Sequence, residues 1–289
     1  MRNFSSEDWG TFLGLDSILL PLEGFPAEVE AAEVALYLAE CSGGQVTLFH
    51  VKRPVASVEE MYNKLREWSM AKAKMLGVTV EAVETVDEAP AEAILERANK
   101  HDMVVMGGRR RLHERVFGGI SSKVVRGASR PVTVITSPIK KLEERTRPLK
   151  KILLPLGVGM EDLPAVKLAA ALTSSASTKD FVIVALRVVT LPQATPTQAF
   201  DDESLKQQGK DFLREVGELS RLVARPIEPR VVVGRDAGRA IVSYAREHSF
   251  DLIVLGERDK PGPLAVLLGT KALYVLRNSP CSVALMYKA

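Results

Sequence analysis

The sequence predicts an α/β protein of two tandem doubly wound domains, each a five-stranded parallel sheet flanked by helices. Two observations lead to this fold class. The chain repeats itself in order, and each half alternates short apolar runs with longer amphipathic stretches. A length of 289 residues also suits two domains better than one.

The internal repeat consists of three matched pairs of segments that follow one another in the same order. They are ILLPL at 18–22 and 152–156, an Asp-to-Gly run at 102–107 and 251–256, and a helix-to-strand run at 126–135 and 277–286. Ordered matches favour duplication over chance. Between the halves, residues 137–150 are rich in charge, bracketed by prolines and without an apolar stripe. We therefore expect one domain at 1–140, a linker at 141–150 and a second domain at 151–289.

The expected strands are short, and some, such as 103–106 and 252–255, are apolar at nearly every position, which is typical of a parallel sheet covered by helices on both faces. They lie at 17–22, 46–51, 78–84, 103–107 and 132–136 in the first half, and at 151–156, 181–188, 229–233, 251–255 and 282–286 in the second.

A helix is predicted between the second and third strands of each half. Apolar residues spaced three, four and seven apart indicate one buried face: Val58, Met61, Leu65, Trp68 and Met75 in one helix, Leu205, Phe212, Val216, Leu219 and Val223 in the other. We interpret the Met and Trp side chains as core packing rather than as a cofactor site.

Composition excludes several classes of protein. Apolar residues make up 46% of the chain, yet no stretch approaches the roughly 18 uninterrupted apolar residues of a membrane helix. An acidic pair stands near the amino terminus where a signal peptide would be apolar, so we expect a soluble, cytoplasmic protein. A net charge of +3 and 6% aromatic residues argue against nucleic acid as a partner.

No catalytic or metal-binding pattern is visible. Cys41 and Cys281 show no redox or ligand spacing, so we expect buried thiols, and His50 reads as a core histidine on a strand. The other histidines, His101, His113 and His248, are not within metal-ligand spacing of one another. There is no nucleophile elbow, and no Walker lysine follows a glycine loop. We therefore expect a protein that is not an enzyme.

A glycine loop follows the fourth strand of the second half. It runs from Gly256 to Gly269 and Thr270, and a helix is predicted to begin next to it, near Lys271. Backbone N–H groups at a helix start, together with a hydroxyl, can hold an anion. The same pattern also arises as a plain helix cap, and this alternative remains open.

The order of strand, glycine loop, helix and final strand resembles the universal stress protein family. Its signature is glycine, two residues, glycine, nine residues, glycine, then serine or threonine. The resemblance covers essentially the whole chain, twice, and includes the ILLPL openings and Leu48-Phe-His-Val51. It implies the fold derived above and a role in the stress response. Many members bind ATP, with an aspartate after the first strand near the nucleotide and the glycine loop around the phosphates.

The chain departs from this pattern in both halves. In the first, Glu23 replaces the aspartate, Arg109–Arg111 replaces the second glycine, and the loop is two residues short and closes on Gly118-Gly119. In the second, Gly157 stands in the aspartate position and Asp259 in that of the second glycine. The resemblance implies these nucleotide-site residues: Glu23, Gly107, Arg109, Arg110, Gly118 and Gly119, with Gly256, Gly269 and Thr270.

The first half is predicted to be the better anion site. Guanidinium groups of Arg109 and Arg110 and the N–H groups of the following helix could converge on one phosphate, whereas Glu257 and Asp259 cancel the cations of the second loop. The alternative is that the arginines form a solvated basic face.

The last strand of each half would otherwise be a bare apolar edge, so we expect the two to cover each other in an intramolecular pseudo-dimer. Further pairing into a homodimer stays open. The function expected is a tandem universal stress protein that binds an adenine nucleotide such as ATP, or has degenerate sites, and regulates without turnover. A slow ATP hydrolase, a partner-binding protein with dead nucleotide sites and a soluble regulator of a membrane transporter are the alternatives.

Overall fold

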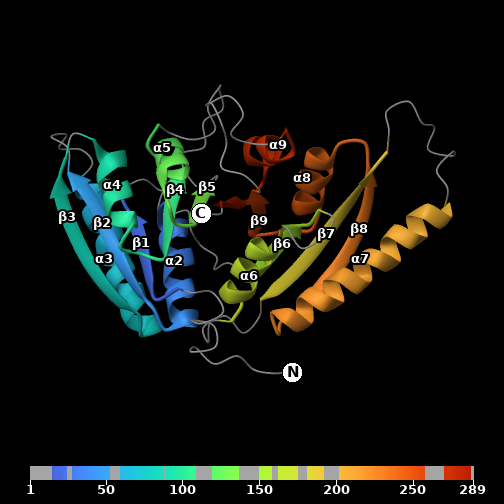
Figure 1. Cartoon of the computed structure of the whole chain (residues 1–289), viewed down its shortest axis with the longest axis horizontal. Coiled ribbons are helices and arrows are strands. Elements are labelled where there is room, and N and C mark those ends of the chain that lie inside the picture. Colours follow the sequence, from blue (N-terminus) through green and yellow to red (C-terminus); the bar gives the residue numbers. More distant parts are fainter. Residues whose placement is uncertain are drawn as a thin grey trace.

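The computed structural model describes residues 15–24, 28–52, 59–87, 89–108, 119–136, 150–157, 162–174, 181–191, 202–257 and 270–287. Its strands form a single ten-stranded sheet in the order β3-β2-β1-β4-β5-β10-β9-β6-β7-β8. Figure 1 shows the two halves side by side, with β1 to β5 on the left and β6 to β10 on the right. The predicted α/β architecture is confirmed.

In the first half the elements are β1 (Ser17–Pro21), α2 (Glu28–Ser42), β2 (Gln45–Lys52), α3 (Glu59–Leu76), β3 (Thr79–Val86), α4 (Pro90–Ala98), β4 (Met103–Gly108), α5 (Gly119–Gly127) and β5 (Val132–Thr136). In the second half they are β6 (Lys151–Pro155), α6 (Leu163–Leu172), β7 (Val182–Thr190), α7 (Asp202–Leu222), β8 (Ile227–Gly234), α8 (Ala237–Glu247), β9 (Leu252–Glu257), α9 (Thr270–Asn278) and β10 (Ser282–Tyr287). Except for Lys150, the predicted linker at 141–150 lies outside the described residues, and the domain bounds stay predictions.

The halves join through their last strands, as the sequence predicts. β5 and β10 pair antiparallel, with Val134 opposite Leu285 and Thr136 opposite Val283. All other strand pairs in the sheet are parallel. Because this joint is antiparallel, the strands of the second half run in the opposite direction to those of the first. The carboxyl ends of the strands therefore lie at one end of the sheet, along the strand direction, in the first half and at the opposite end in the second.

Helices cover both faces of the sheet. The core on one face takes buried side chains from α2, α3, α6 and α7, and the core on the other face takes them from α4, α5, α8 and α9. Neighbouring residues of β1 point to opposite cores, Leu19 to one and Leu20 to the other, and both are fully buried. A strand that packs on both faces needs apolar residues at every position, which explains the run ILLPL.

The repeated Asp-to-Gly run has a structural role at its aspartate. One Asp102 carboxylate oxygen accepts the backbone N–H groups of Asp16 and Ser17, at 3.0 and 2.9 Å. Asp251 accepts those of Lys150 and Lys151 at the same two distances. In each half, the start of the fourth strand therefore holds the start of the first strand beside it.

One predicted helix face is wrong in part. In α3 the buried residues are Tyr62, Leu65, Ser69 and Ala73, and Trp68 is partly buried against the core. Met75 is 81% exposed. The buried face follows small residues, Ser69 and Ala73, that let the helix approach the sheet, and a hydrophobicity count passes over them. In the second half, Phe212, Val216 and Leu219 of α7 and Val223 directly after it are buried as expected.

Strand positions follow the prediction within two residues, and Cys41, Cys281 and His50 are buried as expected. Burial raises the pKa of the Cys41 thiol to about 12, which leaves it protonated and unreactive at neutral pH. Within the described ranges, no helix combines the length and the apolar character needed to cross a bilayer.

Candidate ligand site at the carboxyl edges of the strands

The candidate site of each half lies where β1 and β4, or β6 and β9, end side by side. β1 is flanked by β2 and β4, so the chain leaves it toward one side of the sheet and returns on the other. The second half repeats this arrangement around β6. In doubly wound sheets, ligands bind at the carboxyl ends of the strands at such a reversal.

In the first half, a buried carboxylate holds the turn after β1. Glu28 opens α2 and is only 5% exposed. Its carboxylate accepts the backbone N–H of Glu23 at 3.0 Å and that of Gly24 at 2.7 Å. Gly24 has a φ of 93°, a conformation that glycine adopts without strain. The two N–H groups satisfy the carboxylate in its buried position.

Glu28 also explains the first loop glycine. A Cβ atom at Gly107, in the last part of β4, would lie 2.6 Å from Cγ of Glu28 and 3.2 Å from its Cα. No side chain fits between the end of β4 and the first turn of α2. Ser121, in the first turn of α5, donates its hydroxyl to the Gly107 carbonyl at 3.4 Å, so the amino end of α5 lies next to this point.

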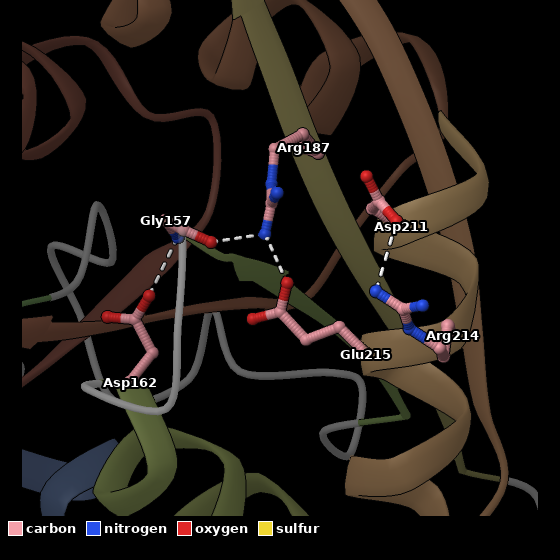
Figure 2. Close-up of polar contacts among 6 residues, drawn as sticks. All are labelled: Gly157, Asp162, Arg187, Asp211, Arg214 and Glu215. Atoms are coloured by element: carbon pink, nitrogen blue, oxygen red, sulfur yellow. Dashed lines mark hydrogen bonds and ion pairs between the residues drawn. The ribbon is translucent and has the colours of Figure 1, made fainter. Parts of the chain in front are cut away.

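The second half uses an aspartate in the same place. Asp162 stands five residues after Gly157, as Glu28 stands five after Glu23, and its carboxylate accepts the Gly157 N–H at 2.7 Å. A Cβ atom at Gly256 would lie 3.2 Å from the other oxygen of that carboxylate. Figure 2 shows Asp162 reaching the amide nitrogen of Gly157 from below.

The Gly157 peptide is also held at its carbonyl. Arg187, on β7, donates one guanidinium N–H₂ group to the Gly157 carbonyl and to Glu215 of α7, the latter at 2.8 Å (Figure 2). The guanidinium stacks 4.4 Å from the ring centre of Phe212. The side chains of Arg187 and Glu215 are only 12% and 18% exposed. The Arg187–Glu215 ion pair therefore lies near the carboxyl end of β7 and is largely enclosed by the protein.

The first half has a histidine at the matching strand position. His50 follows Phe49 on β2 as Arg187 follows Leu186 on β7, and its Nδ1 lies 2.8 Å from the Leu22 carbonyl. Its ring stacks on Tyr62 with centroids 3.8 Å apart. Burial raises the pKa of Tyr62 to about 12. The first half therefore replaces the Arg187 cation with a stacked aromatic pair.

The predicted site residues are only partly described. Gly107 and the turn at Glu23 are brought together through Glu28. Gly119 and Thr270 are the first residues of α5 and α9, and Gly256 lies beside Asp162. Arg109, Arg110, Gly118 and Gly269 lie outside the described residues, as do Arg111 and His113. Among the described side chains, no group of three or more His, Cys, Asp or Glu could hold a metal ion.

Sequence reasoning missed Glu28, Asp162 and Arg187. A carboxylate seven residues after the end of the first strand in both halves was the available signal for the first two. For Arg187, the signal was a cation in an otherwise apolar strand, FVIVALRVV.

Comparison with known proteins agrees with the two-repeat architecture. The chain belongs to the class of α/β proteins that consist of two doubly wound repeats joined through their last strands. The sequence pattern of the universal stress protein family matches residues 14–136 and again 148–286, and the chain belongs to this family.

Two curated relatives and one solved structure illustrate the range. Universal stress protein Rv2005c of Mycobacterium tuberculosis is 28% identical over 198 residues, which cover 67% of this chain and 64% of that protein. Universal stress protein MJ0531 of Methanocaldococcus jannaschii is 30% identical over 142 residues, covering 48% of this chain and 82% of its own. A universal stress protein structure from Archaeoglobus fulgidus shares the fold, with a TM-score of 0.60, 15% identity, and coverage of 94% and 96%.

Proposed function

We propose that this chain is a tandem universal stress protein that binds an adenine nucleotide and acts as a regulatory module of the stress response, without turnover. Its output would be a change in conformation or in partner binding. The proposal takes the first half as the principal nucleotide site and the second half as its structural counterpart.

The observation that carries the proposal is the convergence at the end of β4. In the first half, the turn after β1, the end of β4 and the first turn of α5 meet around Gly107. A helix start offers backbone N–H groups and a partial positive charge to an anion. Family membership supplies the ligand class, since many universal stress proteins bind ATP through this region.

The second half supports the division of roles. Arg187 and Glu215 occupy the carboxyl end of β7, and Arg187 already uses the Gly157 carbonyl. A ligand would have to displace a half-buried ion pair to reach this turn, which is costly because each partner would lose its counter-charge. At the matching strand position the first half has His50 stacked on Tyr62, and the Arg66–Glu84 ion pair beside Tyr62 is more exposed, at 35% and 29%.

Isothermal titration of wild type and two variants tests this function. Replacing Arg109 and Arg110 with alanine should weaken adenine-nucleotide binding by roughly 1.5–3 kcal/mol for each charge-assisted bond lost. Thr270→Ala, in the second half, should leave binding nearly unchanged. If Thr270→Ala abolishes binding and the arginine variant binds normally, the site lies in the second half. If the protein turns over ATP with Mg²⁺ faster than a blank without protein, it is an ATP hydrolase and the proposal of regulation without turnover is wrong.

A further inference from the structure

A groove of about 310 Å³ lies between α4 and β3, at the outer edge of the sheet and two strands away from β1. Phe49 and Val83, which lie opposite each other on β2 and β3, and Ala93 of α4 give it apolar walls. Arg97, in the last turn of α4, and Lys100, just after the helix, add two cations. Apolar walls with a few charged groups, in a space of this size, are the usual make-up of a small-molecule pocket.

Arg97 carries a buried donor that no described residue satisfies. Its Nε atom is enclosed and has no hydrogen-bond partner, and none of the ion pairs in the described ranges involves its guanidinium. The guanidinium carbon lies over the ring of Phe49, 5.8 Å from the ring centre. Nδ1 of the buried His101 lies 3.0 Å from the Arg97 carbonyl oxygen, so the end of the helix is held in place. Because most buried donors are paired, this one indicates an acceptor that binds from outside.

The second half shows that the fold itself does not require a cation here. Ile94 of α4 and Ile241 of α8 are matching buried residues, each followed four residues later by a buried alanine. Three residues after them stand Arg97 in α4 and Tyr244 in α8. The ring of Tyr244 packs beside Phe250, with centroids 5.9 Å apart. The two repeats therefore differ at the position where the first half places its unpaired guanidinium.

We propose that this groove binds a small organic acid, with the carboxylate on Arg97 and the apolar part against Phe49 and Val83. The planar guanidinium presents parallel N–H donors that match the two oxygens of a carboxylate. A dianion such as a phosphate monoester fits less well, because Asp87 and Glu96 also line the groove and repel each added negative charge. The inference concerns a second site and goes beyond the proposed nucleotide function.

Amide NMR titration of the whole chain with benzoate and with hexanoate tests the inference. Benzyl alcohol, which keeps the ring and lacks the charge, is the matched control ligand, and phenyl phosphate is the dianion. We expect both acids to shift the amide signals of α4 and β3 until they saturate. Benzyl alcohol should bind at least about tenfold more weakly than benzoate, because it makes no charge-assisted hydrogen bond to Arg97. Phenyl phosphate should also bind more weakly than benzoate.

Two variants and one control assign the effect to the groove. Arg97→Gln should weaken benzoate binding at least about tenfold, to the level of benzyl alcohol. Arg246→Gln is the matched control, since it removes an exposed arginine from the last turn of α8, and it should keep the wild-type affinity. Ala93→Leu leaves every charge in place and fills the groove from α4, so it should weaken binding of both acids. It also gives an independent result if Arg97→Gln does not fold.

Three results would overturn the inference. The first is that neither acid produces saturable shifts in α4 or β3. The second is that benzoate binds folded Arg97→Gln, or folded Ala93→Leu, as tightly as it binds wild type. The third is that phenyl phosphate binds more tightly than benzoate, which would assign the groove to phosphorylated ligands. None of these measurements depends on an adenine nucleotide, so the proposed function can fail while this inference holds, and the reverse.

Discussion

At the scale of single residues, a glycine at the end of the fourth strand packs against a carboxylate side chain in each half. Gly107 and Gly256 leave room for Glu28 and Asp162, which in turn hold the turn after the first strand. The first glycine of each loop therefore has an internal reason to be glycine, independent of any ligand.

Gly107→Ala should lower the free energy of unfolding by about 1–3 kcal/mol, because Glu28 is pinned by its hydrogen bonds and cannot move away from the new methyl group. Gly209→Ala is the matched control. It lies within α7 with nothing within 4 Å of its added Cβ, so it should raise the free energy of unfolding by about 0.5–1 kcal/mol. Urea unfolding measures both. Equal effects from the two changes would contradict the packing described at Gly107.

At the scale of elements, β7 and α7 are joined by a charged contact at the position where the first half has the His50–Tyr62 stack. Arg187 stacks on Phe212 and pairs with Glu215, and one nitrogen and one oxygen of the pair, Nε and Oε1, are buried without a hydrogen-bond partner. An incompletely satisfied buried pair is weak evidence for stability, yet it becomes expensive when one partner is removed.

Glu215→Ala should therefore cost about 2–4 kcal/mol of unfolding free energy, because it leaves the Arg187 charge buried without its carboxylate. The control is Glu92→Ala, which removes a partner of Lys123 in an ion pair more than half exposed on both sides. That change should leave the free energy of unfolding nearly unchanged. Thermal or urea unfolding distinguishes them, and a Glu215→Ala variant as stable as Glu92→Ala would show that the buried pair contributes nothing.

The elements themselves could be predicted because their signals are local. Apolar runs located every strand, and the ordered repeat located the partner of each element. The face of α3 could not be predicted fully, since Ser69 and Ala73 pack by their small size. Glu28, Asp162 and Arg187 escaped because a charged residue in a sequence suggests exposure. Only the fold shows that backbone N–H groups hold the two carboxylates and that Glu215 and the Gly157 carbonyl hold Arg187, with Glu28 buried and the other two partly buried.

At the scale of the whole molecule, the antiparallel pairing of β5 with β10 makes two repeats into one sheet and places the two candidate sites on opposite edges. The pairing also removes two apolar strand edges that would otherwise be open to other chains. The outer edges are then β3 and β8, and β8 carries Pro229 and the Arg230–Glu228 ion pair, features that discourage further pairing.

Replacing both Val134 and Val283 with aspartate should lower the free energy of unfolding by more than about 4 kcal/mol or separate the halves, because both side chains are fully buried at the joint. Val231→Asp on the outer strand β8 is the control, since that side chain is 41% exposed, and it should be tolerated. Size-exclusion chromatography and urea unfolding report compactness and stability. If the doubly charged variant is as compact and stable as Val231→Asp, the two halves do not associate through β5 and β10.

The proposed role as an adenine-nucleotide module is tested most directly by mass spectrometry of small molecules released from freshly purified protein. We predict an adenine nucleotide, at up to about one per chain, and its loss from the variant that carries Arg109→Ala and Arg110→Ala. A protein that releases no nucleotide, and whose melting temperature shifts with none of adenosine, AMP or ATP, would contradict the account and leave a partner-binding protein with inactive sites.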